Sequence, residues 1–573
     1  MLRIFRIDKC LAKTSNRILL NGRFGSFNRS LVRFVSTKPN IVTKNDGKRY
    51  SGSTVALYFT LGLFLGTSII TYKLAKNPPE FLFPHSSTTK LAEISSPRYG
   101  DPDKVVKELK NVLSADQIRS TKETLETHSD SSFSTHHATP DQRPVAVIFP
   151  NSTEEVSLVL KACHKYKVPV VPYTGGTSLE GHYTPTRKGI SVDLSRMNKV
   201  LAVHAEDLDV TVQAAVGWQT LANYLKSYNL MFGPDPGPGA CIGGMVGTSC
   251  SGTNAARWGT MKENVVSLTV VLADGTIIKT KNRPRKSAAG YNLNGLFIGS
   301  EGTLGIVTEA TLKLNVKPKY ENVAVISFPT ISDASSTVAQ FVQHGIQLDA
   351  MELLDDKMMK YVNVSGQTTL KYDEAPTLML KIGGTTKEAV KSQINDVKRI
   401  SKENHQNSFR FASSDAEREE LWNARKVALW STINYGQEYI DKDIQVWATD
   451  VAVPISKLCE CLTATKNEMN ETGVAGAIVG HVGDGNYHAM ILFKREDRPK
   501  VERIVRHMVD GALKAEGTVT GEHGVGMGKR GFLKQELPPD AIDLMRKIKF
   551  ALDPYRILNP DKVFSIDPKD KGE

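Results

Sequence analysis

The sequence predicts a multidomain α+β protein in which one transmembrane helix precedes the folded part. Three observations lead to this prediction. The 573 residues exceed what one compact core accommodates. From residue 143 onward, apolar strand-like runs alternate with amphipathic helical stretches. Residues 50–72 contain no charged side chain and are long enough to span a bilayer with some tilt.

The positive charge of the chain is concentrated at its N-terminus. Residues 1–49 hold twelve Lys and Arg against two Asp, a net of +10 out of the formal +12 of the whole chain. The remainder therefore carries +2, and it has no basic patch interleaved with aromatic residues. We expect no nucleic-acid partner. The six cysteines are scattered and match neither a disulfide framework nor a paired zinc motif.

Residues 1–37 have the composition of a mitochondrial presequence. They are rich in Arg and Ser, poor in acidic residues, and their apolar residues are spaced amphipathically. A disordered basic tail is the alternative interpretation. If the presequence prediction holds, the protein is targeted to the mitochondrion.

The uncharged run at residues 50–72 then predicts an inner-membrane anchor. A buried core helix is the alternative, but the run lies outside every expected domain. Lys44, Lys48 and Arg49 precede the run, and this charge bias favours an N-terminus on the matrix side. The catalytic part would face the intermembrane space, joined through residues 73–142, a linker and N-terminal helical segment.

Three loops rich in Gly, Ser and Thr lie between residues 143 and 318. They cover residues 173–182, 234–260 and 299–307. Such loops let backbone N–H groups approach a pyrophosphate, although none of them is a Walker loop or a GxGxxG motif. Three of them in one domain favour a dinucleotide cofactor over three unrelated turns. The expected strands are at 145–149, 168–172, 268–272, 276–279, 324–328 and 377–382, and the expected helices at 105–113, 153–166 (capped by Ser152 or Thr153), 332–345 and 387–403.

A hairpin is predicted around Gly483-Asp484-Gly485-Asn486, because Asp-Gly lies there between two apolar runs. This hairpin would bring His481 and His488 together at its open end. Glu522, on a later glycine-flanked loop, would complete a ligand set suited to Zn²⁺ or Mn²⁺. The adjacent His523 would be free to move protons. The alternative is that these are ordinary turn or core residues.

Four motifs in residues 143–318 resemble the flavin-binding domain of the vanillyl-alcohol oxidase/PCMH superfamily: PYTGGTSLEG (172–181), GPDPG (233–237), IGGMVGTSCSG (242–252) and GSEGTLGIVTEATLKL (299–314). Residues 319–573 resemble the cap of its glycolate oxidase/D-lactate dehydrogenase branch through WNAR (422–425), TDVAVP (449–454), GHVGDGNYH (480–488) and GEHGVG (521–526). With the presequence and the membrane run, the chain is most similar to fungal mitochondrial members of that branch that use cytochrome c. The resemblance implies a two-subdomain PCMH-type FAD-binding domain, an α+β cap domain and a C-terminal segment.

The resemblance also implies FAD as the cofactor. Members that bind FAD covalently in the first loop carry histidine where this chain has Thr177, so we expect non-covalent FAD, with His182 as a marginal alternative attachment point. The implied FAD contacts are Thr174, Gly175, Gly176, Thr177, Ser178, Pro236, Gly237, Gly243, Gly244, Gly252, Asn254, Gly259, Thr260, Glu301, Gly302, Gly305, Ile306 and Val307.

The activity that the resemblance implies is oxidation of D-lactate to pyruvate, with electrons passed to cytochrome c. Arg425 would bind the substrate carboxylate, a metal on His481, His488 and Glu522 would assist hydride transfer to flavin N5, and His523 would be the general base. D-2-hydroxyglutarate or glycolate dehydrogenase is the alternative. Ala448, Leu429 and Met490 stand where the 2-hydroxyglutarate branch has polar residues, which favours a small monocarboxylate.

Overall fold

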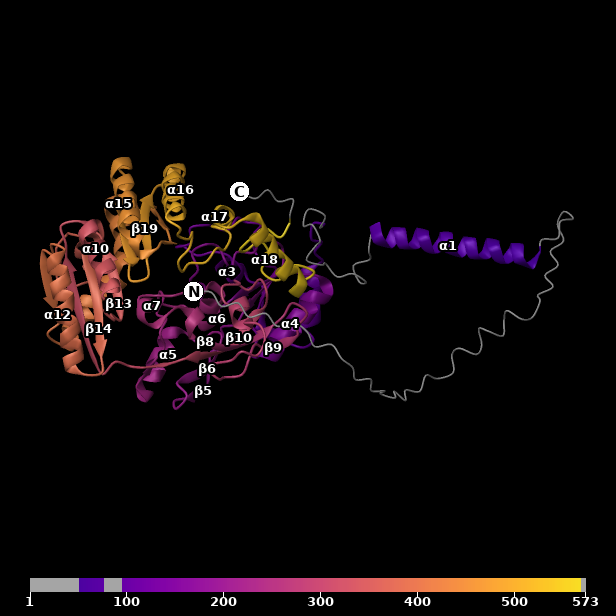
Figure 1. Ribbon diagram of the computed structural model, residues 1–573, viewed down its shortest axis with the longest axis horizontal. Helices are drawn as coiled ribbons and strands as arrows, with labels where there is room; N and C mark the ends of the chain where they lie inside the picture. The colour runs from indigo at the N-terminus through magenta and orange to yellow at the C-terminus, as the bar shows by residue number, and fades with distance from the viewer. Residues whose placement is uncertain (1–50, 77–94, 568–573) are drawn as a thin grey trace, which may run out of the picture. The chain divides into compact units, whose positions relative to one another are not determined.

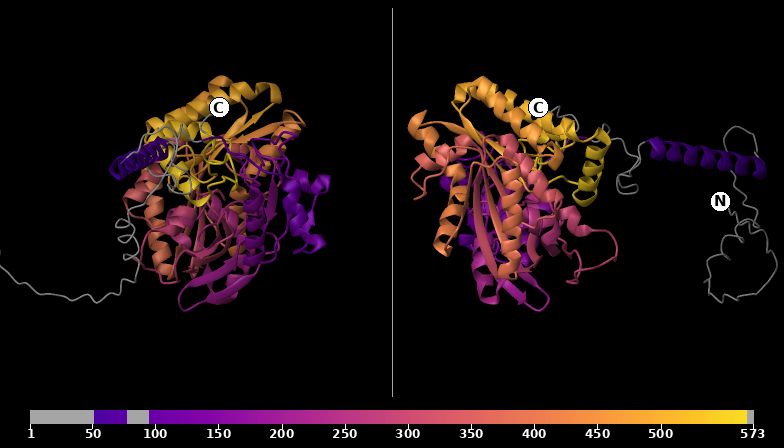
Figure 2. Two further views of the ribbon diagram at one scale, coloured as in Figure 1. Left: turned by 90° about the vertical axis from the view of Figure 1, so that its right-hand side faces the viewer. Right: turned by 60° about the vertical axis from the view of Figure 1, so that its left-hand side comes forward.

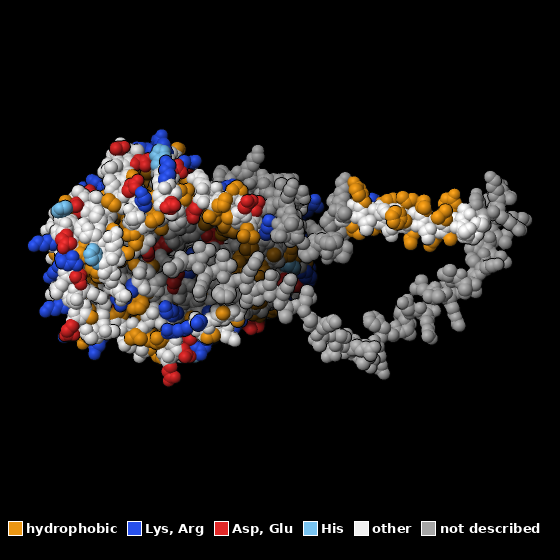
Figure 3. All heavy atoms as spheres, viewed as in Figure 1, with side chains coloured by type: hydrophobic (Ala, Val, Ile, Leu, Met, Phe, Trp, Pro, Cys, Tyr) orange, Lys and Arg blue, Asp and Glu red, His pale blue; other side chains and the backbone are white. Residues whose placement is uncertain are grey.

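The computed structural model describes residues 51–76 and 95–567, and the chain divides into two compact units, residues 1–84 and 85–573. The element described in the first unit is helix α1 (Gly52–Lys76). Its residues Gly52–Leu74 are long and apolar enough to cross a membrane by length and composition. Apolar side chains cover it in Figure 3. The predicted anchor, residues 50–72, overlaps this helix, whereas the predicted presequence lies outside the described residues.

The second unit begins with a four-stranded sheet that leads into the first glycine-rich loop. Its order is β1 (Ile118–Arg119), β2 (Ala146–Ile148), β4 (Ile190–Asp193) and β3 (Val170–Tyr173), and the last three are parallel. Helix α4 (Thr153–Tyr166) has the predicted bounds because Ser152 caps it, its Oγ accepting a hydrogen bond from the Glu155 N–H. Helix α2 (Pro102–Leu109) packs on α4, and η2 (Ala115–Gln117) and α3 (Lys122–Thr127) follow α2.

A five-stranded antiparallel sheet follows, and together with the four-stranded sheet it forms what we call the first body. Its order is β5 (Val200–His204), β6 (Asp209–Gln213), β10 (Ile306–Lys313), β8 (Val265–Val271) and β9 (Ile277–Lys279). Helix α6 (Ile242–Thr248) packs against β10 and β6 and carries the second glycine cluster. The smaller elements around this sheet are α5 (Trp218–Leu225), η3 (Lys226–Tyr228), β7 (Leu230–Met231), α7 (Ala255–Trp258), α8 (Met261–Asn264), α9 (Leu293–Phe297) and β11 (Asn315–Val316).

Residues beyond β11 build a larger antiparallel sheet, and this sheet with its helices is called the cap below. Its order is β15 (Ser408–Phe411), β12 (Tyr320–Ser327), β14 (Thr377–Gly384), β13 (Ala350–Leu354), β18 (Gly476–His481), β19 (Asn486–Phe493) and β16 (Gln445–Ala448), with β17 (Val451–Ala452) pairing β19 off this path. Successive side chains on these strands alternate between two apolar cores. The sheet is therefore buried on both faces.

Helices cover both faces of the large sheet. One core is shared with α10 (Ile331–Gln343), α12 (Lys387–Glu403), α15 (Ile455–Thr472) and α16 (Arg498–Lys514). The other is shared with α11 (Asp356–Val364), α13 (Asp415–Lys426) and α14 (Ala428–Tyr439). Figures 1 and 2 show α10 and α12 lying along the strands. The face visible in Figure 3 mixes Lys and Arg with Asp and Glu, as expected for a folded part with little net charge.

The C-terminal segment returns to the first body. After η4 (Arg495–Asp497), α16, α17 (Arg530–Glu536) and α18 (Pro539–Leu552), residues 553–567 run back to β3, where the Val170 N–H donates to the Ile557 carbonyl at 2.8 Å. Buried Lys549 stabilises this segment, because its Nζ donates hydrogen bonds to Asp553 Oδ2 at 2.5 Å and to the Thr303 carbonyl of the first body at 2.6 Å. The predicted α+β class, with two sheets in the first body, a cap and a C-terminal segment, is confirmed.

Candidate active site

The hairpin of β18 and β19 brings His481 and His488 to the same face of the large sheet. The register pairs Val479 with His488, so His481 lies diagonally across from His488 beside the connecting loop. The prediction that they meet at the open end of the hairpin is therefore wrong in this detail, because the loop spans residues 482–485 and the histidines lie next to it. Their ring centroids are 5.5 Å apart.

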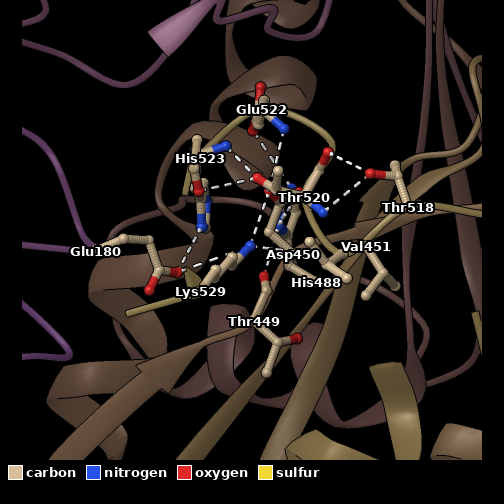
Figure 4. Close-up of polar contacts among 12 residues, drawn as sticks. Glu180, Thr449, Asp450, Val451, His488, Thr518, Thr520, Glu522, His523 and Lys529 are labelled. Carbon is tan, nitrogen blue, oxygen red and sulfur yellow. Dashed lines mark hydrogen bonds and ion pairs between the residues drawn. The ribbon is translucent and has the colours of Figure 1, made fainter. Parts of the chain in front are cut away.

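Asp450 holds the loop that carries Glu522 and His523. Its Oδ2 accepts hydrogen bonds from the backbone N–H groups of both residues at 3.0 Å and from Thr520 Oγ1 at 2.7 Å. Lys529 Nζ lies 3.2 Å from the same oxygen. Burial opposes ionisation of Asp450, but Lys529 and the histidines outweigh it and lower the pKa of its carboxyl. Figure 4 shows these groups converging on Asp450, which fixes the loop against the sheet.

The ligand atoms of His481, His488 and Glu522 lie within 4.8 Å of one another. Both Nε2 atoms face Glu522 Oε1, at 3.1 Å from His481 and 3.4 Å from His488. The Nδ1 atoms are engaged elsewhere: that of His488 donates to the Thr449 carbonyl at 2.8 Å, and that of His481 bonds Glu352 Oε1 at 2.8 Å. Such outer contacts leave the Nε2 lone pairs free for a cation. The residues fit a divalent ion.

Electrostatics favour a charged Glu522 in this cluster. Burial raises the pKa of its carboxyl, but the two imidazoles outweigh burial and hold that pKa well below its ordinary value. Ser251, from the FAD-binding body, also donates to Glu522 Oε2 at 2.7 Å. The first body and the cap therefore meet at this carboxylate.

His523 stacks on His488 and turns its Nδ1 toward Glu180. The two rings are 5.1 Å apart with 15° between their planes, and His523 Nδ1 lies 3.8 Å from Glu180 Oε1. Burial lowers the pKa of His523, but Asp450 and Glu180 outweigh burial and raise it. Figure 4 shows Lys529 reaching between Glu180 and Asp450. The imidazole is thus placed between two carboxylates.

Arg425 lies in the last turn of α13 and bonds a residue that the sequence analysis missed. Its Nε donates to Glu352 Oε2 at 2.6 Å, while Glu352 Oε1 is hydrogen-bonded to His481 Nδ1. Glu352 is fully buried on β13, directly opposite His481 in the sheet register. Glu352 therefore links Arg425 to the histidine cluster. A lone Glu in an apolar strand was the available signal, because such a residue requires a charged partner.

We expect Glu352→Gln to weaken metal binding about 10–100-fold, the usual effect of removing an outer partner of a ligating histidine. The amide keeps the shape of the side chain but removes the charge that faces both His481 and Arg425. Titration of the metal-depleted protein with Zn²⁺ or Mn²⁺ measures the effect. Glu417→Gln is the matched control, because Glu417 pairs with Arg410 at the exposed start of α13. Equal affinities in Glu352→Gln and the parent chain would contradict the bridging role.

A cavity lies between the glycine-rich loops of the first body. Ten of the predicted FAD contacts line it: Thr174, Gly176, Ser178, Gly243, Gly244, Glu301, Gly302, Gly305, Ile306 and Val307. Further lining comes from residues not predicted, among them Tyr173, Tyr183, Ser300 and Asn559. A side chain at position 244 would crowd the cavity wall, because its Cβ would lie 2.9 Å from Thr174 Oγ1. The glycine-rich lining of the cavity, which exposes backbone amides, fits the pyrophosphate of a dinucleotide.

The other predicted FAD contacts lie outside the lining of this cavity. Gly175 and Thr177 pack against Gly239 within the second loop. Pro236, Gly237, Gly252 and Asn254 belong to the loop around Asp235, whose Oδ1 accepts the Asn254 N–H at 2.9 Å. Gly259 ends α7, and Thr260 caps α8, where its Oγ1 accepts the Lys262 N–H. These residues shape the loop, and their contact with FAD stays a prediction.

Comparisons with known proteins agree with this architecture. Residues 144–281 match the family model described as FAD binding domain, and residues 317–563 match that of FAD linked oxidases, C-terminal domain. The chain is 52% identical over 519 residues to D-lactate dehydrogenase [cytochrome], mitochondrial, of Kluyveromyces lactis, covering 89% of this chain and 90% of that protein. It is 54% identical to D-lactate dehydrogenase [cytochrome] 1, mitochondrial, of Saccharomyces cerevisiae, covering 85% of each. Its fold matches that of p-cresol methylhydroxylase with a TM-score of 0.67 at 18% identity, covering 82% of this chain and 98% of that one.

The two-part FAD-binding body and the cap that carries the His–His–Glu cluster define an FAD-dependent oxidoreductase. The chain belongs to the family of FAD-linked oxidases that includes the mitochondrial cytochrome-type D-lactate dehydrogenases.

Proposed function

We propose that this protein oxidises D-lactate to pyruvate and passes the electrons from FAD to cytochrome c. The observation that carries the proposal is the convergence of His481, His488 and Glu522, with His523 stacked on the cluster, in a chain more than half identical to cytochrome-type D-lactate dehydrogenases. FAD, when bound, accepts the two electrons of the substrate Cα–H bond. Thr177 in the first loop favours FAD held without a covalent bond.

Arg425 binds the substrate carboxylate in this proposal. Within the described residues its Nε is taken by Glu352, which leaves the two terminal amino groups of the guanidinium for a carboxylate. The bridge through Glu352 orients these groups relative to His481. The substrate is thereby held at both the arginine and the histidine cluster, and such positioning supplies a large share of the rate.

His523 accepts the hydroxyl proton of the substrate. Its loop is fixed by Asp450, and Glu180 beside Nδ1 stabilises the imidazolium that forms. A divalent ion bound by His481, His488 and Glu522, Zn²⁺ or Mn²⁺, would act as a Lewis acid that favours loss of the hydroxyl proton. The His523 ring stacks on that of His488, which keeps the proposed base beside the proposed metal ligand.

Apolar residues beside the cluster favour a small substrate. Met490 is buried two residues after His488, on the same face of β19, and Ala448 lies directly opposite it on β16. Leu429 packs into the same apolar core. These positions offer no charge to a second carboxylate, so a monocarboxylate such as lactate fits better than 2-hydroxyglutarate.

We therefore expect D-lactate to reduce the flavin with a larger kcat/KM than glycolate or D-2-hydroxyglutarate. Against D-2-hydroxyglutarate the difference should exceed about tenfold, since a second carboxylate would be buried unpaired. Anaerobic bleaching of the flavin absorbance with each acid measures the order. Faster bleaching by D-2-hydroxyglutarate or glycolate would assign the protein to one of those activities.

We also propose that α1 anchors the protein in the mitochondrial inner membrane with the catalytic unit in the intermembrane space. The support is the apolar length of residues Gly52–Leu74 and the excess of basic residues before it. Cytochrome c would then be the available electron acceptor. Reduction of cytochrome c by the lactate-reduced protein, and protease access to the catalytic unit in mitoplasts but not in intact mitochondria, test both statements.

A further inference from the structure

One buried histidine on the wall of the flavin cavity is unsatisfied. His182 is 6% exposed, and among the described residues neither ring nitrogen makes a hydrogen bond, although Nε2 lies in ion-pair range of Glu301. Because His182 lines the cavity, a group bound there is the natural partner.

The backbone of His182 is fixed from two directions. Its carbonyl accepts a hydrogen bond from Asn559 Nδ2 at 3.1 Å, and the same amide donates to the Glu301 carbonyl at 2.6 Å. Gly181, with φ of 69°, packs against Met527 on the other side. The imidazole therefore belongs to a built wall and not to a loose loop.

The carboxylate of Glu301 lies beside this imidazole. Glu301 Oε1 is 3.4 Å from His182 Nε2, and its two oxygens accept the N–H groups of Val525 and Gly526 at 2.7 and 2.8 Å. Glu301 is itself buried and held at a φ of 53°, a conformation that costs a non-glycine residue energy and persists only where surrounding contacts enforce it. A carboxylate at this distance directs an N–H of His182 toward itself.

The pair marks the end of the cavity nearest the reaction. A Cβ on Gly524 would lie 2.7 Å from His182 Nε2 and 2.9 Å from Glu301 Oε1, so His182 touches the loop that carries His523. The reacting ring of FAD must meet the substrate at that loop. The part of bound FAD that would face His182 is therefore the isoalloxazine.

We propose that His182, paired with Glu301 through Nε2, hydrogen-bonds the isoalloxazine of bound FAD through Nδ1 and raises its reduction potential. The inference rests on FAD binding and on this placement of the ring, not on the identity of the hydroxy acid. A donor beside the ring stabilises the reduced flavin, which carries more negative charge than the oxidised form, more than it stabilises the oxidised form. His182 is thus a positioning and tuning residue for electron transfer in this protein.

The test is a redox titration of the bound FAD in the detergent-solubilised full chain. Potentials are measured against a reference dye with dithionite as reductant, without D-lactate. We expect His182→Leu to lower the equilibrium constant for two-electron reduction about tenfold, which corresponds to about 30 mV. His182→Asn, whose amide nitrogen lies near the position of Nδ1, should restore most of the potential. His204→Leu is the control, because His204 pairs with Asp209 on β5 and does not line the cavity.

Each outcome decides the proposal. An unchanged potential in His182→Leu overturns it, as does a variant that binds FAD more weakly but shows the parent potential once saturated with FAD. Recovery by His182→Gln in place of His182→Asn overturns the assignment of Nδ1. If His182→Leu does not fold, Glu301→Gln keeps the imidazole and should lower the potential in the same direction, and an unchanged potential there overturns the pairing. A chain that fails to oxidise D-lactate yet shows these potentials would refute the proposed function alone.

Discussion

His523→Ala is expected to lower the rate at which D-lactate reduces the flavin by about 10²–10⁴-fold, the usual contribution of a general base. FAD should stay bound, because His523 does not line the flavin cavity. The loop should also keep its position, because Asp450 holds it through the backbone N–H groups of Glu522 and His523. Anaerobic stopped-flow measurement of flavin bleaching gives the rate directly.

His507→Ala is the matched control for this variant. His507 lies on α16, is half exposed and bonds Glu468, so its removal should leave the bleaching rate within about twofold, as expected of a surface substitution. Bleaching of His523→Ala at the parent rate would show that another group takes the proton. Loss of FAD from His523→Ala would show that the loop is part of the flavin site.

Removal of the divalent ion should slow flavin reduction about 10²–10³-fold, because a Lewis acid beside the reacting oxygen is worth several kcal/mol. Treatment with a chelator should leave the flavin spectrum unchanged, since His481, His488 and Glu522 lie outside the cavity lining. Added Zn²⁺ or Mn²⁺ should restore the rate in the parent chain. Bleaching at full rate after complete chelation would contradict the role of the cluster.

His488→Ala separates loss of the ion from damage by the chelator. This variant lacks one of three ligands, so it should need far more added ion to recover than the parent chain does. The substitution also removes the hydrogen bond from His488 Nδ1 to the Thr449 carbonyl. Full recovery at the parent ion concentration would show that His488 is not a ligand.

Local patterns in the sequence were sufficient for individual elements. Helix α12 runs over Lys387–Glu403 as predicted, because its apolar period, Thr386 cap and acidic first turn all agree. The Asp-Gly signal placed the hairpin that joins His481 and His488. Glu522 was placed with them on ligand chemistry, and the structure brings the three ligand atoms together.

Contacts between distant segments were not predictable from such patterns. Glu352 contacts His481, which is 129 residues away in the sequence, because β13 pairs with β18. The periodicity of a single segment cannot predict such a pairing. Asp450 appeared only as part of a motif, although its buried carboxylate organises the whole catalytic loop. Gly259 and Thr260 were predicted as FAD contacts, yet Gly also suits the end of a helix and Thr the start of one, and they lie at the end of α7 and the start of α8. Residue types that serve both loops and cofactors cannot be separated without the fold.

The most direct test of the account is one anaerobic experiment on the purified full chain. Its FAD and divalent metal contents are determined, and its flavin absorbance is then followed after addition of D-lactate, before and after chelation. The account predicts one FAD and one divalent ion per chain, rapid bleaching before chelation and slow bleaching after it. A chain that contains FAD but no divalent ion and bleaches rapidly would contradict the metal-assisted site, and a chain that D-lactate never bleaches would contradict the proposed activity.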